Sequence, residues 1–489
     1  MPIEFSRLLI DLAISKMASP ESFQAAQFSR VNEKLAAIAT AITKPEPEVV
    51  GKLTRLSGMR LEVSGLRARV GARCWIETGQ RRGAIAEVVG FEGNQLILMC
   101  EGTAAGLTPG ARVTVLGDSE LVTVGDQLLG RIIDGAGRPL DGFPVISGSS
   151  VPLRGETISP MARQSITQPL DVGVRAINSL LTIGRGQRMG LFAGSGVGKS
   201  TLLGMMTRFT EADVVVVGLV GERGREVREF VEESLGPEGL ARSVVVATPA
   251  DTSPLMRVAG CWRATAIAEH FRDQGKNVLL LMDSLTRFAQ AQREIGLAAG
   301  EPPVSRGYTP SVFATLPNLI ERAGNVGLGS ITAVYTVLVE GDDLQDPIAD
   351  AARAILDGHI VLSRSMAEAG TYPAIDIEAS ISRSMLQITE PEQQEHARLL
   401  KEAFATYHAN KDLISVGAYR MGADPNIDRA INSQDAIKDF VRQPLTERVS
   451  FGEGLAALSR VSNDALVTQT IEPAGQGMAA QTPQLPRVR

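Results

Sequence analysis

Apolar residues follow three different patterns along this chain of 489 residues. In residues 1–44 they recur at helical spacing, with a break expected at Ser19-Pro20 and an end at Lys44-Pro45, because proline lacks the N–H that a helix needs. One seam has the alternating three- and four-residue spacing of a coiled coil. It consists of Phe28, Val31, Leu35, Ile38 and Ile42. Two heptads leave two interpretations open, a helix packed on its own domain or a helix that docks on a partner.

The second pattern covers residues 51–122, where short apolar stretches are separated by glycine-rich turns. This spacing predicts a small β-barrel or sandwich. The expected strands include Leu61–Val63, Ala84–Val89, Gln95–Met99 and Arg112–Leu116. Trp75 and Phe91 are the aromatic residues of this stretch, and they are too few for a surface that stacks single-stranded nucleic acid.

In the third pattern, between residues 150 and 385, largely apolar runs alternate with helical segments. Such runs are typical of a parallel sheet with helices on both faces, so we predict an α/β domain. The runs are Met189–Phe192, Val214–Val220, Val244–Ala247, Val278–Met282, Ile331–Val334 and Ile360–Leu362. The turn-rich segment Gly130–Gly142 marks a junction ahead of them.

The chain becomes helical and charged after about residue 386, and Glu472–Arg489 is rich in proline, glutamine and glycine, which predicts a disordered tail. We therefore expect five segments. They are an N-terminal helical extension (1–47), a β-barrel domain (48–122), an α/β domain (123–385), a C-terminal helical domain (386–471) and the tail (472–489).

The composition argues against several classes of function. The 49 Lys and Arg against 55 Asp and Glu give a net charge of −6, which argues against a general nucleic-acid binder. Three dispersed cysteines fit neither a disulfide scaffold nor a cysteine zinc site, and they suit a reducing compartment. No apolar run approaches the roughly 20 residues that span a bilayer, so we expect a cytoplasmic protein.

The strongest motif is the segment 193–200, AGSGVGKS, between an apolar run and a helix. In a phosphate-binding loop, glycines let backbone N–H groups surround an anion at a helix N-terminus. Lys199 would contact the β- and γ-phosphates of a nucleotide, and the Ser200 hydroxyl would bind Mg²⁺. The sequence departs from the usual pattern at Ala193, where glycine is expected.

Two acidic residues follow apolar runs in the same α/β block. Asp283 ends the run Val278–Met282, where a parallel sheet presents ligands, and it could hold Mg²⁺ directly or through water. Glu222 lies in the segment GERGRE after Val214–Val220, and it could orient or deprotonate an attacking water. A solvated charged turn is the alternative interpretation of that segment.

These motifs in this order resemble the catalytic subunits of the rotary ATPase superfamily, which have a RecA-like core. Among its branches, the chain looks most like the flagellar protein-export ATPase, and next like the ATPase of virulence type III secretion systems. The resemblance covers roughly residues 48–460. Supporting stretches are 171–199, 218–226 (GLVGERGRE), 282–294 (MDSLTRFAQAQRE), 307–313 (GYTPSVF) and 372–383 (YPAIDIEASISR).

The resemblance implies roles for individual residues. Glu222 matches the carboxylate that activates the hydrolytic water, Arg223 would lie near the phosphates, and Tyr372 matches the aromatic residue that stacks on adenine. Arg383 matches the arginine finger that a neighbouring subunit supplies. The predicted catalytic residues are thus Lys199, Glu222, Arg223 and Arg383, and the predicted Mg²⁺ ligands are Ser200 and Asp283. The predicted ATP-binding residues are Gly194, Ser195, Gly196, Val197, Gly198, Lys199, Ser200, Thr201 and Tyr372.

The same resemblance implies a homohexameric ring at the inner face of the cytoplasmic membrane. Its partners would be a stator-like regulator bound through residues 1–44, a central coiled-coil stalk protein, the export gate, chaperones and cargo. The function expected is Mg²⁺-dependent ATP hydrolysis that drives flagellar protein export. The alternatives are the virulence-secretion version, a ring RNA translocase of termination-factor type, and a nucleotide-binding subunit without turnover. The last is disfavoured because Glu222 and Arg383 occur on one chain.

Overall fold

The computed structural model describes residues 49–79, 82–117, 121–155, 158–339 and 346–463, together with Asn32 and Lys34. Apart from those two positions, the predicted helices of residues 1–44 lie outside the described residues, as does the predicted tail 472–489. Among the helices that are described, none is both long and apolar enough to cross a membrane.

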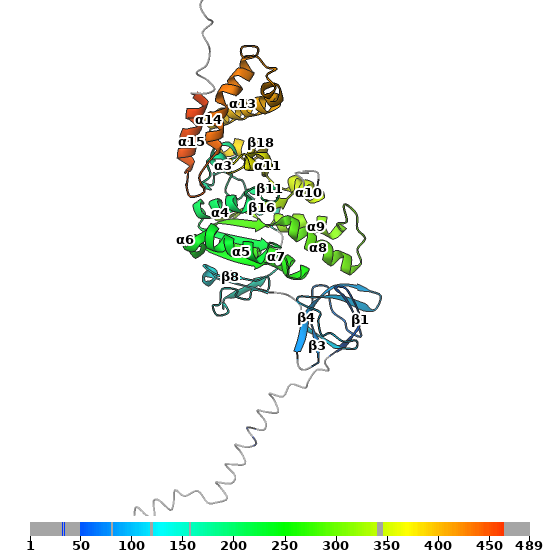
Figure 1. The fold of residues 1–489 in the computed structure, drawn as a ribbon. Helices are drawn as coiled ribbons and strands as arrows, with labels where there is room; N and C mark the ends of the chain where they lie inside the picture. Colours follow the sequence, from blue (N-terminus) through cyan, green and yellow to red (C-terminus); the bar gives the residue numbers. More distant parts are fainter. Residues whose placement is uncertain are drawn as a thin grey trace, which may run out of the picture. The chain divides into compact units, whose positions relative to one another are not determined.

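Six strands form a closed barrel in the order β1-β2-β5-β4-β3-β6 (Figure 1, blue). Alternation builds its core, since Cys74 and Ile76 of β3 are buried while Arg73 and Trp75 are partly exposed. The predicted β-barrel is therefore confirmed. Its strands are β1 (Gly51–Ser57), β2 (Arg60–Ser64), β3 (Arg73–Thr78), β4 (Arg82–Glu92), β5 (Gln95–Cys100) and β6 (Arg112–Gly117).

A ten-stranded sheet forms the centre of the α/β region, with its main path in the order β18-β17-β11-β16-β14-β12-β13-β8. The strands from β17 to β8 are parallel, and β18 is an antiparallel edge strand. The predicted parallel sheet is confirmed, and each of the six predicted runs lies in one of its strands. The strands are β8 (Ile132–Ile133), β11 (Arg188–Ala193), β12 (Val214–Val220), β13 (Ser243–Thr248), β14 (Asn277–Asp283), β16 (Gly329–Leu338), β17 (Gly358–Leu362) and β18 (Ile375–Ser382).

Short strands complete the region. β10 (Arg163–Gln164) and β15 (Gly324–Val326) pair antiparallel with each other and extend the sheet through β16, and β7 (Leu121–Val124) pairs with β9 (Ser149–Pro152). The predicted junction segment Gly130–Gly142 contains β8, which pairs with β13. That segment is therefore more than a turn, because it also supplies the last strand of the sheet.

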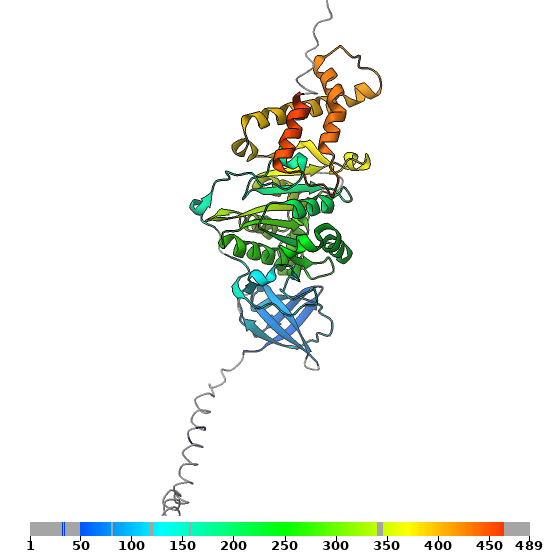
Figure 2. The same ribbon diagram turned by 90° about the vertical axis from the view of Figure 1, so that its left-hand side faces the viewer.

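The sheet is buried on both faces, as β12 illustrates. Val214 and Val216 pack in one core with α7 and α8, and Val215 and Val217 pack in a second core with α3 and α4. Figures 1 and 2 show helices on both sides of the strands. The helices of this region are α3 (Arg175–Leu180), α4 (Lys199–Phe209), α5 (Gly224–Glu229), α6 (Gly236–Ala241), α7 (Pro254–Asp273), α8 (Leu285–Ala299), α9 (Pro310–Ile320), α10 (Pro347–Ile355), α11 (Arg364–Glu368) and α12 (Met385–Ile388).

The chain after the sheet is helical, as predicted, and comprises α13 (Pro391–Ser415), α14 (Pro425–Val441) and α15 (Phe451–Val461) (Figure 2, orange and red). These helices have no separate core. Leu400, Phe404 and Ile437 are buried in the cluster that also contains the α4 face of the sheet. The C-terminal helices are therefore anchored on the face that carries the predicted phosphate-binding helix.

Candidate active site

The predicted phosphate-binding loop joins β11, inside the sheet, to α4. Gly196 and Gly198 have φ angles of 77° and 92°, in the left-handed region that favours glycine. A Cβ atom at Gly198 would also approach the Tyr372 ring to 3.2 Å. The loop therefore needs glycine at these two positions, and it turns the chain so that the N-terminus of α4 faces the cavity described below.

Ala193, the departure from the usual motif, fits its position. It is the last residue of β11, where the chain is extended and pairs with β16, and its side chain is buried. An extended backbone accepts a Cβ atom without strain. The alanine therefore leaves the loop that starts at Gly194 unchanged.

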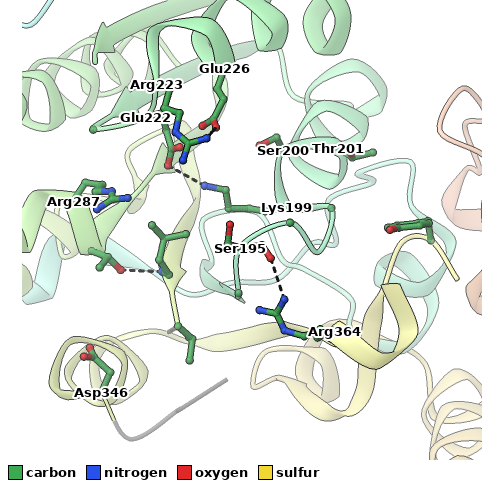
Figure 3. Close-up of a pocket in the computed structure, with 18 of the residues that line it drawn as sticks. Ser195, Lys199, Ser200, Thr201, Glu222, Arg223, Glu226, Arg287, Asp346 and Arg364 are labelled. Carbon is green, nitrogen blue, oxygen red and sulfur yellow. Dashed lines mark hydrogen bonds and ion pairs between the residues drawn. The ribbon is translucent and has the colours of Figure 1, made fainter. Parts of the chain in front are cut away.

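Lys199 lies between two carboxylates (Figure 3 shows its contact with Glu222). Its Nζ donates to Glu222 Oε1 at 3.0 Å and to Asp283 Oδ1 at 2.6 Å. Asp283 ends β14 and Glu222 follows β12, which pairs with β14 in parallel, so the two acids emerge at the same edge of the sheet. Thr336 of β16 donates a further hydrogen bond to Asp283 Oδ1 at 2.6 Å. The topology thus brings four residues together that are far apart in sequence.

The electrostatics of this cluster leave one negative charge in excess. Burial lowers the pKa of Lys199, but the carboxylates of Asp283 and Glu222 outweigh burial and the net shift is upward, so the lysine stays charged at neutral pH. For Asp283, burial and the nearby Glu222 carboxylate together raise the pKa more than Lys199 and Thr336 lower it. A second cation at this position would stabilise the charged carboxylates.

This environment suits Mg²⁺. The described part of the chain has no group of three or more His, Cys, Asp or Glu side chains that could enclose a metal ion. Mg²⁺ does not need one, because it keeps several waters and is usually held by one or two protein oxygens plus substrate phosphates. The Asp283 carboxylate and the Ser200 hydroxyl, in the first turn of α4, supply oxygen ligands of this kind.

A cavity of about 1820 Å³ opens above the cluster. Most predicted ATP-binding residues line it, including Gly194, Ser195, Thr201 and Tyr372, together with Glu222 and Arg223. Val197 is buried beside it, and Asp283 lies behind Lys199 with 5% of its side chain exposed.

Arg383 does not reach the cavity of its own chain. It follows β18, it is exposed, and its guanidinium contacts only the Arg353 carbonyl at 3.4 Å among the hydrogen bonds of the described residues. The structure thus separates it from the other predicted catalytic residues.

The cavity wall is rich in arginines, of which the sequence predicted only Arg223 as a site residue. Arginines outnumber carboxylates along it, which suits a polyphosphate. They are Arg223, Arg257, Arg287, Arg293, Arg306, Arg364 and Arg442, together with Arg175, whose guanidinium is bound to carbonyls at the end of α14. Arg364 reaches the phosphate loop, where its Nη1 donates to the Ser195 carbonyl at 3.4 Å (Figure 3). A signal existed for α8, since Arg287 and Arg293 lie in the stretch 282–294 that carries the family resemblance. Arg364 has no comparable signal.

Comparisons with known proteins agree with this geometry. Residues 173–382 match the family model of the ATP synthase alpha/beta family, nucleotide-binding domain, and residues 389–460 match that of the T3SS EscN ATPase C-terminal domain. The chain is 58% identical to a flagellum-specific ATP synthase of Pseudomonas aeruginosa, over 87% of this chain and 96% of the relative. It is 50% identical to a type 3 secretion system ATPase of Xanthomonas euvesicatoria, over 85% of this chain and 94% of the relative.

Solved structures are similar as well. The assembled ATPase EscN from the type III secretion system of enteropathogenic E. coli superposes with a TM-score of 0.80 at 45% identity, covering 84% of this chain and 99% of that chain. EscN in complex with its central stalk EscO gives a TM-score of 0.77 at 44% identity, with the same coverage.

Proposed function

The chain belongs to the family of flagellum-specific ATP synthases and type 3 secretion system ATPases, and we propose that it hydrolyses ATP in the arginine-lined cavity to drive protein export. The observation that carries this proposal is the position of Lys199, between Glu222 and Asp283 at the N-terminus of α4. Phosphoryl transfer to water requires an ammonium group, a water-activating acid and a metal-binding acid, placed here at one edge of the sheet.

Binding of the triphosphate follows from the loop. The backbone N–H groups of residues 194–201 and the N-terminus of α4 would hold the phosphates, and Lys199 would contact the β- and γ-phosphates. Ser200 and Asp283 would hold Mg²⁺, which when bound neutralises charge on the phosphate oxygens. A γ-phosphate competes with Glu222 for the Lys199 ammonium, and this competition would release the carboxylate for its role in hydrolysis.

Glu222 would accept a proton from the attacking water or orient that water toward the γ-phosphorus. Arg223, the next residue, lines the same cavity and would stabilise charge on the phosphate oxygens. Tyr372 lies beside Gly198, and its position at the wall supports stacking on adenine.

We propose that a second copy of the chain supplies Arg383. Its exposure and its distance from its own cavity support this role, because an arginine finger must be free to enter a neighbouring site. The likeness to assembled EscN supports a homohexameric ring, and the EscN–EscO complex supports a central stalk protein as a partner. Each interface would then contain one complete site.

The export apparatus served is proposed to be flagellar. The 58% and 55% identities to flagellum-specific ATP synthases of Pseudomonas aeruginosa and Salmonella typhimurium, against 50% to the Xanthomonas secretion ATPase, favour it over a virulence system. The other proposed partners are a stator-like regulator bound by residues 1–44, the export gate, chaperones and cargo, at the inner face of the cytoplasmic membrane. No specific nucleic acid is proposed.

The test of this function measures ATPase rate against protein concentration, with and without Mg²⁺. We expect Mg²⁺-dependent phosphate release that rises more steeply than linearly with concentration, since the site is completed by assembly. A verified monomer that hydrolyses ATP as fast as the assembled ring would contradict the shared site. Restored motility of a strain lacking its flagellar ATPase would support the flagellar assignment.

A further inference from the structure

Gln443 links three parts of the chain at the Tyr372 end of the cavity. It is 1% exposed, and its side-chain oxygen and nitrogen both have partners. Its Oε1 accepts from the Arg175 backbone N–H at 2.7 Å, and its Nε2 donates to the carbonyls of Gly173 at 2.9 Å and Glu447 at 2.8 Å. Its backbone N–H donates to the Tyr372 carbonyl at 2.9 Å. One buried residue therefore joins α3, the segment after α14 and the Tyr372 loop.

Arg175 binds the end of α14, next to Gln443. Its Nη1 lies 3.2 Å from the carbonyl oxygens of Asp439 and Phe440 and 3.4 Å from that of Arg442. These are carbonyls at the end of α14, which lack partners within the helix, and a cation there is favourable. The Arg175 guanidinium also lies over the Phe440 ring, 6.0 Å from its centre.

The segment held in this way forms the wall of the cavity next to Tyr372. Its cavity-lining residues are Asp439, Arg442, Gln443, Pro444 and Leu445. We infer that Arg175 and Gln443, which we call the base clamp, are positioning residues. They hold the Tyr372 loop and the end of α14 in fixed relative positions, and so they shape the end of the site that binds adenine. This inference rests on the proposed function, in which Tyr372 contacts adenine. It makes adenine binding depend on the placement of the C-terminal helices.

The base clamp can be loosened without detaching the C-terminal region. Asp171 and Asn178, both buried, hold the following segment through separate bonds, for example from Asn178 Nδ2 to the Val449 carbonyl at 3.1 Å and from the Phe451 N–H to Asp171 Oδ2 at 3.1 Å. A buried and fully bonded polar network favours one arrangement, so losing one member displaces its neighbours. Gln443→Leu keeps the volume and removes only the side-chain bonds.

The experiment compares Mg–ATP with inorganic tripolyphosphate, which keeps the phosphate chain and lacks the base. Binding of each is measured by calorimetry for the full chain, alongside KM and kcat for ATP. We expect Gln443→Leu and Arg175→Met to weaken ATP binding about tenfold, as much as if one hydrogen bond to the base were lost, with tripolyphosphate binding changed less than about twofold. KM should rise with little change in kcat, because binding of the base is common to ground and transition states.

Two further variants make the result decisive. Arg242 also caps a helix, since its guanidinium donates to the carbonyls of Thr207 and Arg208 in α4 and to two carbonyls just after that helix. Arg242→Met should therefore leave the ATP-to-tripolyphosphate affinity ratio unchanged. Tyr372→Ala should lower that ratio. If Tyr372→Ala lowers it and both clamp variants do not, the inference is overturned and the proposed function stands. If Tyr372→Ala leaves it unchanged, the adenine contact itself is wrong. Equal weakening of both ligands by the clamp variants would also overturn the inference.

Discussion

Replacing Glu222 by glutamine tests the chemistry of the site with little change in shape. The Oε1 atom that accepts from Lys199 at 3.0 Å can be kept, because a glutamine side chain also has an acceptor oxygen in that position. The loop and the second contact of Lys199, to Asp283 at 2.6 Å, are unaffected. The substitution thus removes the negative charge and the proton-accepting ability, and little else.

The expected loss follows from that role. Removing a positioned general base typically lowers the rate by about 10²–10⁴, which corresponds to about 3–5 kcal/mol in the activation barrier. ATP binding should be kept or strengthened, because one negative charge leaves a cavity that receives a polyanion. The pKa of Lys199 should fall, since one of the two carboxylates that raise it is gone, yet Asp283 still favours the charged ammonium.

The assay measures phosphate release in a single turnover together with equilibrium binding of Mg–ATP. Glu229→Gln is the matched control, because it makes the same change at a glutamate that does not line the cavity. Glu229 lies on the neighbouring α5 and forms an ion pair with Arg225 at 2.5 Å. The control should hydrolyse ATP within about twofold of the parent chain, because an exposed ion pair outside the cavity contributes little even to stability. If Glu222→Gln hydrolyses ATP at the parent rate while binding it normally, the assignment of Glu222 as the water-activating acid is wrong.

Other predictions concern the lysine, the arginine finger and a buried amine. Lys199→Ala should lower ATPase activity at least about a hundredfold, the effect of losing one preorganised group on the developing charge; near-normal phosphate release would refute the site. Arg383→Ala mixed with Lys199→Ala should regain activity that neither variant has alone, since mixed rings contain interfaces with both groups intact; confirmed mixed rings without activity would argue against a finger in trans. Burial lowers the pKa of Lys401 to about 8, and such a base destabilises the fold increasingly as the pH falls from its ordinary pKa near 10.5 toward about 8, so Lys401→Met should stabilise the chain by at least about 1 kcal/mol at pH 7. Thermal melting should show this gain shrinking as the pH approaches 10; a gain independent of pH would show that the charge is not its cause.

The sequence alone determined six strands of the sheet and the phosphate-binding loop, because both depend on short-range rules. Apolar runs such as Val214–Val220 can be buried only inside a covered sheet, and the glycines at 196 and 198 can be recognised without knowing their neighbours. The identity of Glu222 and Asp283 as candidates likewise follows from their place after such runs.

Only the tertiary structure decided which residues meet. The sheet order puts β16 between β11 and β14, so Thr336 reaches Asp283, although nothing in the local pattern around Thr336 indicates it. Arg364 and Gln443 contact the site across long sequence separations, where one polar residue looks like any other until the chain folds. Side-chain contacts of this kind depend on the relative placement of whole elements, which local spacing does not encode, whereas periodicity and turn chemistry are read directly from the sequence.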